Sequence, residues 1–214
     1  MRFYIPPNLQ RDFTDSLNAL GIDTVVNFDP LNVIKIRLDK VNYRTKGSIV
    51  SADEVVFAEL TSNLKMGDYL QYKNETMLIT QLKSDEFPKC LEFATTTCNT
   101  KFTITRYQTG TWDDNENVII PEGDNPIATD FYCSTIFESF EFKVGTGQVG
   151  IVPTNQIIST CQYNTDTGNI VVGDTFIWMK QTYRVISLNY EQLDISGLYG
   201  LLSFNAEKVI SDAA

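Results

Sequence analysis

A helical pattern of hydrophobic residues lies near the start of the chain. Pro6 and Pro7 lead into Asn8, a residue suited to capping the first turn of a helix. Gly21 follows the last apolar position and is expected to end the helix in the left-handed conformation. The apolar stripe consists of Leu9, Phe13, Leu17 and Leu20. The pattern predicts one short helix whose apolar face packs on the first domain rather than on a partner protein.

After residue 21 the period of the pattern changes to two. Ile34, Ile36 and Leu38 are separated by single charged residues, which is typical of a strand with one solvent-facing side. Short strand-like segments follow in series and are separated by turn residues such as Gly67 and Asp68. They cover residues 55–60, 69–72, 77–81, 90–95 and 101–106. Strands this short and this regularly spaced favour a small barrel or sandwich.

Residues 108–130 differ from the strand-like segments because they are polar and rich in Asp, Asn, Gly and Pro. We interpret this segment as an exposed connection between two domains. The chain would then divide into a first β domain with the N-terminal helix, residues 1–107, and a connection with a second β domain, residues 108–214. The acidic side chains of the segment do not have the spacing of an EF-hand loop, so no metal site is expected there.

An internal repeat relates the two halves. Residues 67–79 align without gaps on residues 173–185, at an offset of 106. In both copies a Gly-Asp pair opens a strand, a polar turn follows, and a second strand returns, as in a β-hairpin. The repeat predicts that Gly67 is equivalent to Gly173 and Tyr72 to Trp178. It also predicts that Trp178 and Tyr183 are largely buried and face each other across one hairpin.

Weaker matches extend the repeat in both directions. The same offset pairs Leu82 with Leu188, Asn99 with Asn205, and Ile104 with Ile210. Upstream, an offset of 102 pairs residues 47–50 with 149–152, and Val55-Val56 with Ile157-Ile158. A repeat of almost half the chain length predicts a tandem duplication: two small β-barrel or sandwich domains in a mainly β chain.

Composition supports a β fold and narrows the chemistry. Thirteen Phe, ten Tyr and two Trp suit half-buried pleated surfaces. There is no histidine, which removes His-based nucleophile activation, His-ligated zinc and the usual general base near neutral pH. The four cysteines are not spaced as Cys-x-x-Cys, and we interpret them as buried, reduced thiols. They are Cys90, Cys98, Cys133 and Cys161. We therefore expect no catalytic, cofactor-binding or metal-binding residues.

The charge of the chain bears on its partners. Seventeen basic residues stand against 27 acidic ones, a net charge of −10. Sequence-specific nucleic-acid binding normally requires a basic surface, so none is expected. The chain has no run of eighteen apolar residues and no signal-peptide pattern at its start. These features predict a protein that is not membrane-bound and that is made in the cytoplasm.

Two stretches carry a resemblance to a known family. Residues 172–186, with Gly173-Asp174 before one strand and Thr182-Tyr183 in the next, resemble the signature hairpin of head-closure and head–tail joining (neck) proteins of tailed bacteriophages. Residues 98–104 and 111–117 are similar to a Cys-Asn-x-x-Leu-x-Trp stretch of structural proteins encoded among the head–tail genes of phages of Gram-positive bacteria. In this chain Ile104 stands where that Trp would be.

The resemblance implies a virion structural protein that forms a ring at the neck or upper tail, joins head and tail, and lets DNA pass. Its implied partners are itself, a portal or adaptor protein, and tail proteins, with assembly in the host cytoplasm. The alternative is a tail or capsid accessory β-domain that binds carbohydrate or a host surface through exposed aromatics such as Trp112 and Trp178. A glycoside hydrolase using Asp113 and Glu116 would need both acids in one cleft, and nothing in the sequence places them so. We expect no enzymatic activity.

Overall fold

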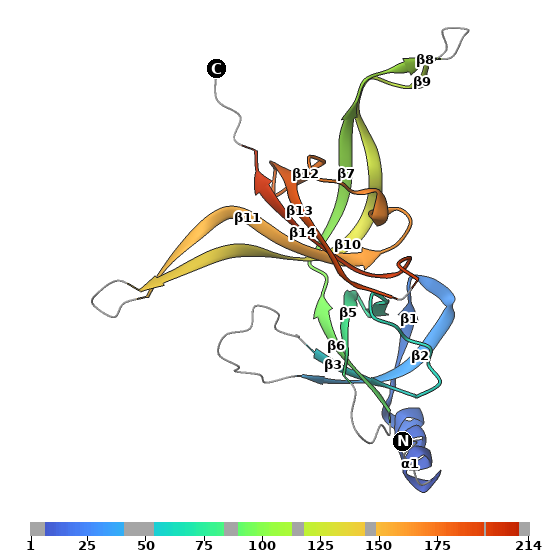
Figure 1. The fold of residues 1–214 in the computed structure, drawn as a ribbon. Helices are drawn as coiled ribbons and strands as arrows, with labels where there is room; N and C mark the ends of the chain where they lie inside the picture. The colour runs from blue at the N-terminus through green and yellow to red at the C-terminus, as the bar shows by residue number, and fades with distance from the viewer. Residues whose placement is uncertain are drawn as a thin grey trace. The chain divides into compact units, whose positions relative to one another are not determined.

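The chain forms two compact units, Met1–Cys98 and Asn99–Ala214. The computed structural model describes residues 7–40, 54–83, 90–112, 118–143, 149–194 and 196–209. Each unit contains a closed barrel of six strands (Figure 1). The prediction of a mainly β chain with two small tandem β domains and a short N-terminal helix is confirmed.

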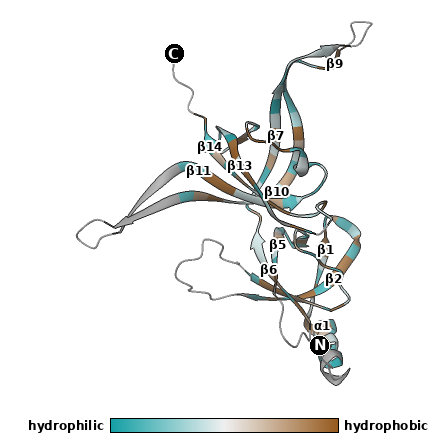
Figure 2. Cartoon of the chain, in the orientation of Figure 1, coloured by the Kyte–Doolittle hydropathy of each residue, from teal (hydrophilic) through white to brown (hydrophobic). Residues whose placement is uncertain are grey.

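The first barrel closes in the order β1-β2-β3-β6-β5-β4, with every neighbouring pair antiparallel. Its elements are the helix α1 (Pro7–Leu20) and the strands β1 (Ile22–Val26), β2 (Asp29–Lys40), β3 (Glu54–Ala58), β4 (Tyr69–Tyr72), β5 (Glu75–Lys83) and β6 (Leu91–Thr97). On β2 the alternation predicted from the sequence is present: Ile36 is fully buried, while Arg37 and Asp39 are exposed. Figure 2 shows such alternation of hydrophobic and hydrophilic residues along the strands.

The second barrel closes in the order β7-β10-β11-β14-β13-β12, also antiparallel throughout. Its elements are β7 (Thr100–Gln108), β10 (Gly123–Lys143), β11 (Val149–Tyr163), the short 3₁₀ helix η1 (Thr167–Asn169), β12 (Thr175–Trp178), β13 (Gln181–Leu193) and β14 (Gly200–Lys208). Between β7 and β10, the strands β8 (Thr111–Trp112) and β9 (Val118–Ile120) form a separate two-stranded sheet. Strand by strand, the connectivity repeats that of the first barrel.

The repeated hairpin occupies equivalent places in the two barrels. Tyr72 pairs with Glu75 across a two-residue turn, and Trp178 pairs with Gln181 in the same way. The predicted equivalence of Tyr72 and Trp178, and of the two Gly-Asp pairs that precede these strands, is therefore confirmed. The match of Leu82 with Leu188 also holds, since each pairs with a phenylalanine of the following strand.

The upstream part of the predicted alignment is wrong by one residue. Ile79 and Val185 are equivalent. In the first barrel, the β6 residue that pairs with Ile79 also pairs with Glu54 on β3. In the second barrel, the β14 residue that pairs with Val185 also pairs with Ile157 on β11. Ile157 therefore corresponds to Glu54 rather than to Val55. Because side chains alternate between the faces of a strand, a slip of one residue would exchange inward and outward positions.

The downstream pairing of Asn99 with Asn205 is also wrong. Asn205 lies within β14, the counterpart of β6, whereas Asn99 immediately precedes β7. The offset of 106 cannot continue here because ten residues separate the paired Leu82 and Phe93, whereas fifteen separate the paired Leu188 and Phe204. The residues 47–50 and Ile210 of the predicted alignment lie outside the described residues.

The domain boundary lies earlier in the chain than predicted. β7 belongs to the second barrel, so the two units meet between Cys98 and Asn99 rather than after residue 107. The segment 108–130 is not a connection between domains, because Gln108 pairs with Gly123 in the ladder between β7 and β10. Its described residues instead belong to an extension of one hairpin of the second barrel and to the start of β10.

The helix α1 ends as predicted, but for a different physical reason. Gly21 donates its backbone N–H to the carbonyl of Leu17 at 2.7 Å, and its φ lies outside the left-handed region. A Cβ at this position would lie 2.2 Å from the Leu17 carbonyl oxygen, so close approach of the backbone requires glycine. The helix begins at Pro7, which places Asn8 in the first turn rather than at the cap. Leu17 is buried, whereas Leu20 is exposed.

The two cores differ in composition. The first is mainly aliphatic and contains Leu70, Met77 and Ile79 around Phe93. The second is strongly aromatic; its rings are those of Phe102, Phe131, Phe176, Tyr183 and Phe204. These rings contact one another directly, with centroids of Phe102 and Phe176 4.5 Å apart. Tilted and edge-to-face contacts of this kind contribute about 0.5–1.5 kcal/mol each beyond the buried area.

Candidate functional site

The Gly-Asp pair forms the same corner in both barrels. Gly67 and Gly173 have positive φ values of 95° and 101°, which glycine adopts without steric cost. Each following aspartate is buried and turns one carboxylate oxygen back on the loop: Asp68 accepts from the backbone N–H of Lys65 at 2.7 Å, and Asp174 accepts from that of Val171 at 2.9 Å. The corner is therefore a structural device that directs the chain into β4 or β12.

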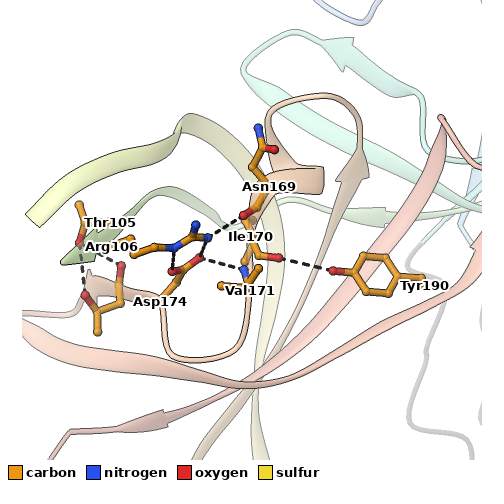
Figure 3. A network of polar contacts seen from close by, with 8 residues as sticks. Thr105, Arg106, Asn169, Ile170, Val171, Asp174 and Tyr190 are labelled. Carbon is orange, nitrogen blue, oxygen red and sulfur yellow. Dashed lines mark hydrogen bonds and ion pairs between the residues drawn. The ribbon is translucent and has the colours of Figure 1, made fainter. Parts of the chain in front are cut away.

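The other carboxylate oxygen has a different partner in each barrel. In the first, Asn27 donates its side-chain amide to Asp68 at 2.6 Å. In the second, Arg106 donates Nε and Nη2 to the two oxygens of Asp174, at 2.6 and 2.9 Å (Figure 3). The hydrogen bonds to Asp174 raise the pKa of the Arg106 guanidinium, although partial burial works against this. A bidentate pair of this geometry is among the stronger charge-assisted interactions in proteins.

This ion pair lies at the seam where the second barrel closes. β12 and β7 share one ladder pair, Thr175 with Thr105, whose hydroxyls are 3.2 Å apart. Arg106 also donates to the carbonyl of Asn169 at 2.8 Å, so it holds the η1 loop against the same seam (Figure 3). Arg106 and Asp174 therefore fasten the barrel, and the Gly-Asp motif of the second copy has a structural explanation.

The Cys-Asn motif also acts as a structural fastening. Asn99 accepts from the backbone N–H of Thr135 at 2.9 Å and donates to the Thr135 carbonyl at 2.7 Å. The hydroxyl of Thr100 lies 2.9 Å from that of Thr135. Ile104, which stands where the family's Trp would be, is fully buried in the core. The motif thus ties the start of β7 to β10.

The second barrel carries a hairpin extension that we call the β7–β10 arm, which comprises the described residues 106–112 and 118–125. Beyond Thr105 the strand β7 pairs with β10 alone, and β8 and β9 continue the arm. Tyr107 and Val118 are more than half exposed. The Tyr107 hydroxyl donates to Glu122 at 2.8 Å, and this hydrogen bond raises the pKa of the phenol. In the first barrel the equivalent hairpin turns within two residues, Asn27 and Phe28.

A second extension leaves the barrel through β10 and β11. Residues 139–143 pair with 149–153, whereas β14 pairs with β11 only from Gln156 onward. We call this two-stranded part the β10–β11 ribbon (Figure 1). Within a closed barrel every strand has two neighbours, but a ribbon exposes backbone donors and acceptors along its edges. Such edges can accept a strand from another chain.

The turn between β12 and β13 lies beside the base of the ribbon. Ile177 and Met179 are 73% and 65% exposed. Phe137, which is 51% exposed, lies with its ring centroid 4.9 Å from that of Trp178. Tyr183 is buried, as predicted, and its ring lies 5.7 Å from Trp178, but Trp178 itself is only half-buried. The reason is its position in the last rung of the hairpin, at the rim of the core.

Other residues considered from the sequence form no site in the described part of the chain. Asp113 and Glu116 lie outside the described residues, and so does the side chain of Trp112. All four cysteines are thiols; Cys133 and Cys161 are buried opposite each other on β10 and β11, whereas Cys90 and Cys98 are half-buried. Among the described residues no group of His, Cys, Asp and Glu could hold a metal ion. The described helices include none long and apolar enough to cross a membrane.

A comparison with protein families decides the relationship of the chain. Residues 92–207 match the family model of the YomX C-terminal domain, which is 116 of 214 residues. The chain belongs to this family. YomX is a protein of a Bacillus prophage, so the chain is phage-related. The match begins in β6 and includes every strand of the second barrel, with both extensions. No curated protein matches the chain.

Proposed function

We propose that the protein is a non-enzymatic virion structural protein of a tailed bacteriophage, which forms a ring at the neck or upper tail. The ring joins head and tail through contacts with a portal or adaptor protein on one side and tail proteins on the other. DNA passes through its lumen. Membership of a phage family supports the virion assignment, and the resemblance of residues 172–186 to neck-protein hairpins supports the position.

The observation that carries this proposal is the pair of extensions on the second barrel. The β7–β10 arm and the β10–β11 ribbon add strand pairs that barrel closure does not need. The arm contains the first residues of β10, and the ribbon contains its last residues. The two extensions therefore leave the barrel from opposite ends of this strand. Elements of this kind suit a protein that contacts neighbours on two sides, as a ring subunit must.

The distribution of charge agrees with a lumen that DNA traverses. Residues 99–214 contain six basic and fourteen acidic residues, a net charge of −8 out of the −10 of the whole chain. A negatively charged wall repels the phosphate backbone, so it would not hold the DNA during its passage. The proposal therefore includes the second barrel as the domain that lines the lumen.

Imaging of assembled particles tests the position. Cryo-electron microscopy of wild-type particles should place the protein on the head–tail axis as a closed ring. In a matched variant, residues 109–122 are replaced by Asn-Gly, so that Gln108 and Gly123 are joined by a two-residue turn like that of the first barrel. This variant should fold, but its particles should lack the ring or the tail. A protein found off the axis would overturn the proposal.

A second candidate function rests on Phe137 and Trp178. Their adjacent rings lie at the rim of the second barrel, where aromatic faces could stack on a sugar. An accessory domain of tail or capsid that binds carbohydrate or a host surface would use them so. This function predicts protein scattered over the capsid or at tail tips in the same images. It also predicts that Phe137→Ala abolishes adsorption without changing particle assembly.

A further inference from the structure

The two ends of the second barrel differ in charge, and the strand register defines these ends. β7 starts with Thr100 beside Cys133 and finishes with Gln108 beside Gly123, where the β7–β10 arm begins. β12 runs antiparallel to β7 from their shared pair at Thr105. The turn after β12, residues 179–180, therefore lies at the end of the barrel opposite to the arm.

The end that carries the arm is acidic. Its described acidic side chains are exposed; they are Glu122, Asp124, Asp166 and Asp194. Asp166 follows β11 and Asp194 follows β13, and both strands finish at this end because Tyr163 and Leu193 both pair with Gly200. The guanidinium of Arg106 is neutralised here by Asp174. The described arm residues 107–112 and 118–125 contain Glu122 and Asp124 and no basic residue.

The opposite end is basic and apolar. Lys180 is exposed in the turn after β12, between Met179 and Gln181, which are also exposed. Lys208 on β14 pairs with Tyr183 near the start of β13. Lys101 lies near the start of β7, and its ammonium is 4.9 Å from the Tyr132 ring centroid. Two described acidic residues lie toward this end: Glu138 at the base of the ribbon, and Glu207, which precedes Lys208 and pairs with Arg184. We call this end, with Lys101, Lys180, Lys208, Ile177 and Met179, the basic end.

We propose that the acidic end of one copy, through its β7–β10 arm, docks on the basic end of the next copy. This inference rests on the proposed ring and names the surfaces that would form it. Charge complementarity favours the head-to-tail arrangement, and it disfavours a two-fold dimer that would bring two acidic ends together. The exposed Tyr107 and Val118 of the arm provide apolar surface for Ile177 and Met179. Repeated head-to-tail contacts of this kind close into a ring when the rotation permits.

Charge reversal tests the contact. Lys180→Glu and Asp124→Lys should each lower the amount of the protein in assembled particles by about tenfold, because each places like charges in the interface. The double variant K180E/D124K restores opposite charges and should recover most of the wild-type amount. The matched control is Lys73→Glu, which reverses a charge in the equivalent turn of the first barrel and should leave assembly unchanged. Equal losses in all three single variants would overturn the inference.

Crosslinking separates this inference from the proposed function. Particles assembled from a mixture of isotopically light and heavy protein are treated with a zero-length carbodiimide, which joins amines to carboxylates. Mass spectrometry should find mixed-isotope peptides that link Lys180 to Glu122 or Asp124. If images show an axial ring that lacks this link and tolerates Lys180→Glu, the docking surface is wrong while the ring stands. If the link forms in a protein that lies off the axis, the contact stands and the neck function is wrong.

Discussion

The first and second barrels share their connectivity and their Gly-Asp corner, but they fasten the closing seam differently. In the first barrel, β1 and β4 share two ladder pairs, and Asn27 adds its backbone and side chain to Tyr69. In the second, β7 and β12 share the pair at Thr105, and the ion pair of Arg106 with Asp174 supplements it. The shorter seam has the stronger single interaction. Duplicated barrels can therefore preserve a corner while exchanging the partner of its carboxylate.

A second difference concerns what the barrels expose. The first turns from β1 into β2 within two residues, whereas the second extends the equivalent hairpin into the β7–β10 arm. An aromatic core accompanies these extensions, and its ring contacts reach from Phe102 to the rim at Trp178. The second barrel thus combines a more aromatic core with the surfaces that we assign to assembly. Four predictions test how far this difference reaches, in order of expected effect.

The largest effect is expected from the core. Phe176→Ala should destabilise the second barrel by about 3–5 kcal/mol, because it leaves a cavity among several rings. Leu70→Ala, at the equivalent position of the first barrel, should cost about 2–4 kcal/mol. Both tryptophans lie in the second unit, so tryptophan fluorescence in a denaturant melt reports on that barrel. A fluorescence transition that shifts with Leu70→Ala as much as with Phe176→Ala would show that the barrels unfold as one unit.

The seam should give the next largest effect. Arg106→Ala leaves the buried carboxylate of Asp174 without its cation and should cost about 3 kcal/mol, at the lower limit for a buried pair because Arg106 is one-third exposed. Asn27→Ala removes a neutral donor and should cost about 1–2 kcal/mol in the first barrel. Circular dichroism can follow both melts. The double variant Arg106→Ala/Asp174→Ala should be less destabilised than the sum of its single changes; strict additivity would argue against the pair.

The rim should be less sensitive than the core. Trp178→Ala should cost about 2 kcal/mol, below the range for a fully buried aromatic, because the side chain is half-buried. Tyr72→Ala, its counterpart in the first barrel, is the matched comparison and is also half-buried. Unfolding can be followed by circular dichroism, since the first substitution removes a fluorophore. A loss of 4 kcal/mol or more for Trp178→Ala would mean that the rim is packed as tightly as the core.

The sequence predicted the architecture well where local patterns coincide with closed strands. The alternation in β2, the Gly-Asp corners and the polar hairpin turns depend on short-range geometry; the structure places these turns at residues 73–74 and 179–180. The domain boundary was wrong because β7 follows β6 with the same alternating pattern, and only pairing with β10 and β12 assigns it to the second barrel. No local signal distinguishes the two assignments.

The candidate surfaces were less accessible to sequence analysis. The ion pair between Arg106 and Asp174 joins residues 68 positions apart. No sequence pattern around either residue predicts this contact. The β7–β10 arm has the composition of a linker, because an exposed hairpin and an exposed connection between domains favour the same residue types. The opposite charges of the two barrel ends emerge only once the register shows where Lys180 and Asp124 lie.

The smallest effect on stability concerns the thiols, which can serve as reporters for the two units. Under native conditions Cys90 and Cys98 should react with an alkylating reagent well before Cys133 and Cys161, whose side chains are fully buried in the second barrel. Non-reducing mass spectrometry after unfolding should find four alkylatable thiols. Arg106→Ala should accelerate labelling of Cys133 and Cys161 and leave the other two rates unchanged, because labelling of a buried thiol requires opening of the barrel that contains it. A disulfide between Cys133 and Cys161, which face each other across adjacent strands, would show that the core is exposed to oxidation and that the predicted reduced state is wrong.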